Sequence, residues 1–157
     1  MKDPVSMKES FIVNNIVINA PMAQVWDALV NPEKTKIYMF GCETVSEWTP
    51  GSSLIWRMDY EGKEFIAVKG TIIDFQPPHR LVYTVIDPNG AIPDLPENYL
   101  TVTYQLEEQG QGTLLTVTQG DYSMVADGER RYAESFNNGE GWNPILAQIK
   151  ALVELNN

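Results

Sequence analysis

Apolar and polar residues alternate along most of the chain between residues 54 and 119. This period of two is typical of antiparallel β-strands that have one packed face and one solvated face. Short turn sequences separate the alternating segments, which we expect to form strands over residues 54–60, 65–75, 81–86, 100–106 and 115–119. A sheet with one apolar face has to be covered by another element, so this pattern predicts an α+β fold.

Helical periodicity appears on both sides of this central region. A β-branched segment over residues 11–19 predicts a first strand, and two short helices are expected after it, over residues 22–30 and 33–39. Towards the end of the chain we expect a short helix over residues 126–136 and then a long amphipathic helix that begins near Trp142. This last helix has the longest apolar stripe available to cover the sheet.

The expected arrangement favours a cavity. A C-terminal helix of about 15 residues is roughly 23 Å long, which is enough to cross a sheet. A helix laid across a strongly curved sheet rarely fills the concavity with its own side chains, so we expect an empty space between the two. Gly70 lies inside the longest alternating segment and predicts a bulge or a sharp bend there.

Composition excludes several classes of function. The chain carries 11 basic and 21 acidic residues, a net charge of −10, and such a field repels nucleic acid and anionic membrane surfaces. No apolar run approaches the length of a membrane span, and the N-terminus has no apolar signal region. We therefore expect no nucleic-acid partner, no membrane insertion and a cytoplasmic protein, with a flexible leader over residues 1–9 and a single domain over residues 10–157.

Reactive side chains are scarce. Cys42 is the only cysteine and His79 the only histidine, so the chain has neither an internal disulfide nor a histidine- or cysteine-rich zinc site. Gly51 and Gly62 stand alone in turns and form no phosphate-binding loop. We expect no catalytic residues, no metal and no cofactor.

The order of elements and several short motifs resemble a known group of proteins. The motifs are Ile18-Asn19-Ala20-Pro21, Val25-Trp26-Asp27-Ala28-Leu29, Pro50-Gly51-Ser52, Gly70-Thr71-Ile72, Pro77-Pro78-His79-Arg80-Leu81-Val82-Tyr83, Gly112-Thr113-Leu114-Leu115-Thr116-Val117-Thr118 and Gly141-Trp142. The sequence resembles the START-like (SRPBCC) superfamily and, within it, the activator of heat-shock protein 90 ATPase homologue family. The resemblance implies a helix-grip fold, in which a curved antiparallel sheet of about six to seven strands wraps around the C-terminal helix.

Ten residues on the apolar faces are our candidates for the walls of the cavity: Trp56, Met58, Tyr83, Val85, Tyr104, Val117, Gln119, Trp142, Ile145 and Ile149. Ligand pockets are mostly apolar with a few polar anchors, which fits this set. Gln119 interrupts the apolar face of the last strand and is the candidate anchor. The phenols of Tyr83 and Tyr104 either reach a ligand or pair with backbone and water, and the helical residues either face the cavity or belong to the core.

The sequence supports three hypotheses of different classes. The first is a protein that binds an apolar small molecule by burying it, without catalytic machinery. The second, implied by the resemblance, is a chaperone-associated module; we do not expect a chaperone partner, because the additional N-terminal domain of such co-chaperones is missing from this sequence. The third is a polyketide cyclase-like enzyme, which can work by the shape of its pocket alone. A homodimer stays open.

Overall fold

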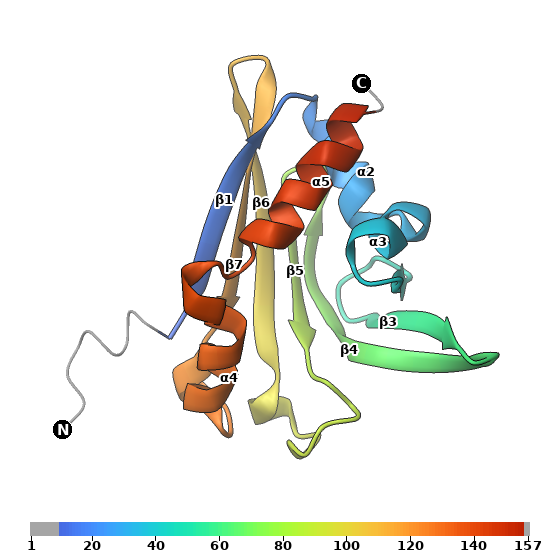
Figure 1. Ribbon diagram of the computed structural model, residues 1–157, viewed down its shortest axis with the longest axis vertical. Helices are drawn as coiled ribbons and strands as arrows, with labels where there is room; N and C mark the ends of the chain where they lie inside the picture. Colours follow the sequence, from blue (N-terminus) through green and yellow to red (C-terminus); the bar gives the residue numbers. More distant parts are fainter. Residues whose placement is uncertain (1–9, 156–157) are drawn as a thin grey trace.

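The computed structural model describes residues 10–155, so the leader expected over residues 1–9 lies outside the described residues. Seven strands form one antiparallel sheet in the order β1-β7-β6-β5-β4-β3-β2 (Figure 1). The strands are β1 (Ile12–Ile18), β2 (Glu43–Ser46), β3 (Ser53–Tyr60), β4 (Lys63–Gln76), β5 (Arg80–Val85), β6 (Leu100–Gln109) and β7 (Gly112–Gly120). The α+β helix-grip fold that the sequence predicts is confirmed.

The helices also follow the predicted order. They are α2 (Met22–Val30), α3 (Pro32–Tyr38), α4 (Gly128–Phe136) and α5 (Asn143–Leu155), together with the short 3₁₀ segments η1 (Pro96–Asn98), η2 (Tyr122–Met124) and η3 (Asn137–Gly139). Asn31 separates α2 from α3, and its side chain accepts a hydrogen bond from the Glu33 amide, which caps the second helix. Pro32 takes the first position of α3, where a missing N–H costs nothing.

The first two strands lie at opposite edges of the sheet, so the chain has to cross a whole face between them. Helices α2 and α3 make this crossing, and α5 later packs beside β1 and α2 (Figure 1). All three helices therefore cover the same face of the sheet. The other face is open to solvent at positions such as Val13 and Ile73, which are more than half exposed.

Two elements differ from the expectation. Strand β2 was not predicted, because it is only four residues long and depends on pairing with β3. Helix α5 begins at Asn143, one residue after Trp142, and is 13 residues long rather than about 15. Trp142 therefore belongs to the junction before the helix, where the backbone is free to turn its side chain toward the sheet.

Strand β4 bends where Gly70 was expected to bend it. A Cβ atom at this position would overlap the carbonyl oxygen of Thr84, so the backbones of β4 and β5 approach each other more closely than a side chain permits. Regular pairing with β5 stops at Ile72, and only the Lys69–Ile86 bridge continues it. In Figure 1 the β3–β4 pair accordingly swings away from the direction of β5 and β6.

Candidate functional site

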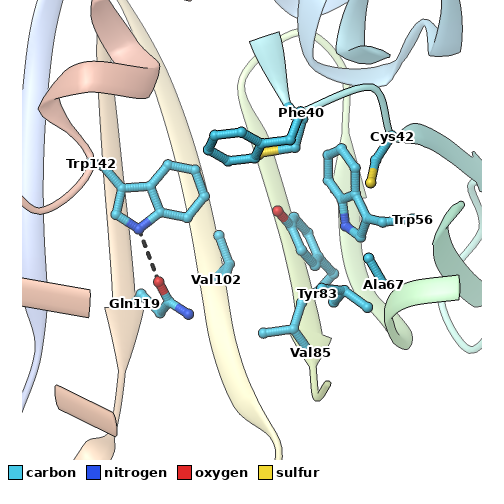
Figure 2. A pocket seen from close by; sticks show the side chains of 11 residues that line it. Phe40, Cys42, Trp56, Ala67, Tyr83, Val85, Val102, Gln119 and Trp142 are labelled. Carbon is cyan, nitrogen blue, oxygen red and sulfur yellow. Dashed lines mark hydrogen bonds between the residues drawn. The ribbon is translucent and has the colours of Figure 1, made fainter. Parts of the chain in front are cut away.

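A cavity of about 240 Å³ lies between the concave face of the sheet and the segment over residues 39–42 (Figure 2). Strands β3 to β7 supply its floor and walls, and Trp142 closes one side. The lining residues are Met39, Phe40, Cys42, Trp56, Ala67, Val68, Tyr83, Val85, Val102, Gln119 and Trp142. Most of these side chains are apolar, as in pockets that hold small organic molecules.

A β-bulge shapes one wall of the cavity. Trp56 pairs with Val68 and Arg57 pairs with Ile66, so Ala67 is an extra residue without a partner on β3. Successive residues of a regular strand point to opposite faces, whereas a bulge re-aims a side chain. This explains why the neighbours Ala67 and Val68 both line the cavity. The small side chain of Ala67 leaves part of the space empty.

Trp142 is held in place by three parts of the sheet. Its backbone N–H donates to Asn14 Oδ1 at 2.9 Å, and its indole Nε1–H donates to Gln119 Oε1 at 2.9 Å. Its ring meets that of Tyr104 edge-on, with 5.9 Å between centroids. Gly141 makes the approach possible, because it has a positive φ of 49° and a Cβ there would overlap Asn14.

The tyrosines on the concave face are neutral. The Tyr83 hydroxyl donates to the Tyr104 hydroxyl at 3.4 Å, so the two phenols pair with each other, an arrangement that the sequence did not predict. Burial raises the pKa of Tyr83 well above its ordinary value and raises the pKa of Tyr104 to about 12. Neither phenol therefore carries a charge at neutral pH.

The segment over residues 39–42 forms the mouth of the cavity. Phe40 is 78% exposed and has a φ of 56°, a conformation that costs a residue with a side chain roughly 1–2 kcal/mol. Below it, Cys42 is buried, and burial raises the pKa of its thiol, which therefore stays protonated. Thr35 holds the segment to α3, since its hydroxyl donates to the Cys42 carbonyl and accepts from the Thr44 amide.

The structure brings five of the ten candidate residues to this cavity: Trp56, Tyr83, Val85, Gln119 and Trp142. The other five do not line it. Tyr104 and Val117 lie on the same face of the sheet but are covered by neighbouring side chains, and Met58 lies at the edge near Gly41. Ile149 is completely buried in the core and Ile145 packs against that core. The cavity therefore lies at the N-terminal end of α5, not beneath its whole length.

Six lining residues were missed by the sequence reasoning: Met39, Phe40, Cys42, Ala67, Val68 and Val102. Val102 was accessible to it, because it alternates with Tyr104 on the same face of its strand. The cavity role of residues 39–42 and of the bulge at Ala67 depends on contacts between distant segments. Patterns in the local sequence do not predict such contacts.

No Lys, Arg, Asp or Glu of the described residues lines the cavity. Arg57 forms ion pairs with Glu43, Asp59 and Glu64. Within residues 10–155, no cluster of three or more His, Cys, Asp or Glu side chains is arranged to hold a metal ion. In the same part of the chain, no helix is both long and apolar enough to cross a bilayer.

Comparison with known proteins adds the family. Residues 19–154 match the model of AHSA1, described as activator of Hsp90 ATPase homolog 1-like protein. The chain belongs to this family. A protein from Cytophaga hutchinsonii, known from a solution structure, is 38% identical over 93% of this chain and 94% of its own, with a TM-score of 0.72.

More distant structures share the fold. A Nitrosomonas europaea protein is 21% identical, with a TM-score of 0.70, over 94% of this chain and 96% of its own. An HSP90 activator from Plasmodium falciparum is 15% identical, with a TM-score of 0.64, over 92% of this chain and 96% of its own. The search among curated proteins matched none of them to this sequence. The resemblance to the family is thus confirmed, and the fold is typical of ligand-binding domains.

Proposed function

We propose that this protein binds an apolar small molecule in the cavity between the sheet and the segment over residues 39–42. The observation that carries the proposal is the cavity itself, which is lined almost entirely by apolar and aromatic side chains. Burial of apolar ligand surface would supply roughly 25 cal/mol per Å² removed from water. Trp56, Tyr83, Val85, Gln119 and Trp142 are the proposed ligand contacts from the sequence, to which the missed lining residues are added.

Binding is favoured over catalysis by the chemistry of the walls. An enzyme of the polyketide cyclase kind that used acid–base chemistry would need a titratable group near neutral pH facing the substrate. Among the described lining residues, the titratable ones are Cys42 and Tyr83, and burial raises the pKa of both. Neither provides a base at neutral pH, so retention of a ligand is the better supported role.

The chaperone-associated alternative has weaker support. The family description refers to an ATPase activator, and the Plasmodium falciparum protein is named as one. At 15% identity, however, that relative shares the fold alone. A stable complex with a heat-shock ATPase in a pull-down would shift the proposal toward this alternative.

The proposal is tested by native mass spectrometry of the protein purified from its own host. We expect a defined apolar compound bound at near-stoichiometric occupancy. The variant Ala67→Phe fills the cavity from the bulge and should emerge without the compound. Ile73→Phe is the matched control, because it adds the same ring to β4 at a position that is 52% exposed. Equal occupancy in Ala67→Phe and the unmodified protein would contradict the proposal.

A further inference from the structure

The hydrogen-bond partners of the polar groups that line the cavity restrict the kind of ligand that can bind there. This inference rests on the proposed function. The indole N–H of Trp142 is used by Gln119, and the hydroxyl of Tyr83 donates to Tyr104. Cys42 offers only a weakly donating protonated thiol. The amide of Gln119 remains the strongest hydrogen-bonding group to examine.

The orientation of the Gln119 amide follows from its partner. An indole N–H is a donor and never an acceptor, so the atom 2.9 Å from it has to be the amide oxygen. The amino group, Nε2, then points to the opposite side, toward Val85 across the cavity (Figure 2). Within the described part of the chain, Nε2 has no protein acceptor. The hydrogen bond from Trp142 thus orients the Gln119 amide so that its amino group, a hydrogen-bond donor, faces the cavity.

The charge of the ligand is restricted by the same walls. None of the described lining residues is Lys, Arg, Asp or Glu, and the titratable pair of Cys42 and Tyr83 stays neutral. A carboxylate or an ammonium group would lose its hydration on entry without gaining a countercharge, which is strongly unfavourable. The cavity therefore selects neutral molecules.

Size and shape follow from the volume and the aromatic walls. At the packing density of a protein interior, a cavity of about 240 Å³ accommodates about 180 Å³ of a ligand, which is the size of two fused rings with a short substituent. Rings of Trp56, Tyr83 and Trp142 surround the space, and aromatic rings pack well against one another in tilted and offset arrangements.

We propose that the ligand is a neutral aromatic compound with one hydrogen-bond acceptor, such as a carbonyl oxygen, which binds Gln119 Nε2. Trp142 is the positioning residue, because its indole holds the amide with the donor turned toward the ligand. A ligand of the same shape that lacks the acceptor would bury this amino group without a partner, which is costly, so it should bind less tightly.

Three probes of matched shape test this inference by calorimetric titration. The first is 2-acetylnaphthalene, which carries the acceptor; the second is 2-isopropenylnaphthalene, in which a CH₂ group replaces the carbonyl oxygen; the third is the charged 2-naphthoate. We expect the ketone to bind about twofold to tenfold more tightly than the alkene, and 2-naphthoate to bind far more weakly than both. In amide NMR spectra, the side-chain NH₂ signals of Gln119 should shift with the ketone and not with the alkene.

Two variants separate the donor from the packing of Trp142. Gln119→Leu and Gln119→Met both remove the amide with its amino group and keep a side chain of similar size, without adding a new donor. In both, the ratio of ketone to alkene affinity should fall to about one or below. The ratio cancels any general loss of packing, so it reports the hydrogen bond itself. An unchanged ratio in Gln119→Leu would overturn the inference.

The outcomes distinguish this inference from the proposed function. If ketone and alkene bind the unmodified protein equally and Ala67→Phe abolishes binding of both, the cavity binds ligands, but the hydrogen bond from Gln119 to the acceptor does not contribute to affinity. If 2-naphthoate binds as tightly as the ketone, the requirement for neutrality is wrong. If no probe binds, the inference fails, while the occupancy measured by native mass spectrometry still decides the proposed function. If Ala67→Phe binds the probes as well as the unmodified protein does, they bind outside the cavity and the inference fails.

Discussion

The two halves of the sheet present similar apolar faces, but one half is filled and the other is hollow. In the half formed by β1, β7 and β6, where α5 packs on β1, the core is completely buried at Leu115, Val117, Leu146 and Ile149. In the half that includes β3, β4 and β5, the face looks onto a cavity of about 240 Å³. The difference does not arise from the polarity of the strands, which alternate in the same way.

The elements that cover the two halves of the sheet explain why one half is filled and the other is hollow. Helix α5 turns an apolar side chain toward the core at every turn, whereas the segment over residues 39–42 is not helical and leaves Phe40 largely exposed. The bend at Gly70 also turns β3 and β4 away from the other strands. A hollow half therefore requires an irregular cover and a bent sheet, and each can be tested separately.

The largest effect is expected from Gly70→Ala, which removes the bend. The new methyl group would overlap the Thr84 carbonyl, and backbone atoms yield only at a cost of about 3 kcal/mol or more of unfolding free energy. Gly62→Ala is the control, because Gly62 has a φ of 81° and open space around it, so it should lose only about 1–2 kcal/mol. If urea denaturation shows that both variants lose the same free energy of unfolding, the close approach of β4 to β5 at Gly70 is not required for stability.

A matched pair of valines compares a filled and a hollow position on the neighbouring strands β7 and β6, where the filled half borders the cavity. Val117 on β7 and Val102 on β6 are 0% and 1% exposed, but only Val102 lines the cavity. Val117→Ala should lower the free energy of unfolding by about 2–3 kcal/mol, because it opens a new void. Val102→Ala should lower it by about 1 kcal/mol, because its side chain already faces empty space. A larger loss for Val102→Ala would mean that the cavity wall is packed as tightly as the core.

Alkaline pH tests the boundary between the halves, where Tyr83 lines the cavity and Tyr104 is covered. Tyrosine in an unfolded chain titrates near pH 10, and burial raises the pKa of both residues in the folded state. The folded protein therefore retains protons that the unfolded chain releases. The stabilisation is complete below about pH 10 and is lost as the pH rises toward 12.

Ultraviolet absorbance of tyrosinate, followed alongside circular dichroism, checks this expectation. Ionisation of the buried phenols should coincide with unfolding. If Tyr83→Phe removes a tyrosinate signal that appears before unfolding, then water reaches the cavity wall in the folded state, and the hollow half is more open than we infer.

The smallest effect on stability concerns Phe40. Phe40→Gly and Phe40→Ala both remove an exposed ring from the mouth of the cavity, and both should weaken binding of 2-acetylnaphthalene. Only glycine relieves the positive φ of 56°, so Phe40→Gly should be about 1 kcal/mol more stable than Phe40→Ala. Identical thermal midpoints for the two variants would show that residue 40 is not constrained as described.

Sequence periodicity gave a reliable guide to the fold but only half of the candidate cavity. The helix over residues 22–30 was predicted with the boundaries that α2 has, because Pro21 and Asn31-Pro32 mark both ends. Strand β2 was missed, because its four residues carry too little pattern. Among the proposed contacts, Gln119 and Trp142 stood out as a polar interruption and as the start of an apolar stripe. The bulge at Ala67 had no such sign.

The chain by itself determined which side of each strand and helix is apolar, since that depends on neighbours a few residues apart. It also determined that the protein carries a net negative charge. One histidine and one cysteine are too few for a histidine- or cysteine-rich metal site. Tertiary structure alone decided where the space remains. The hydrogen bond between Trp142 and Gln119 joins two parts of the chain, and the bulge at Ala67 and the turn at Phe40 line a cavity only because other strands lie opposite them. The cavity is what these segments fail to fill, and packing over such distances leaves no periodic trace.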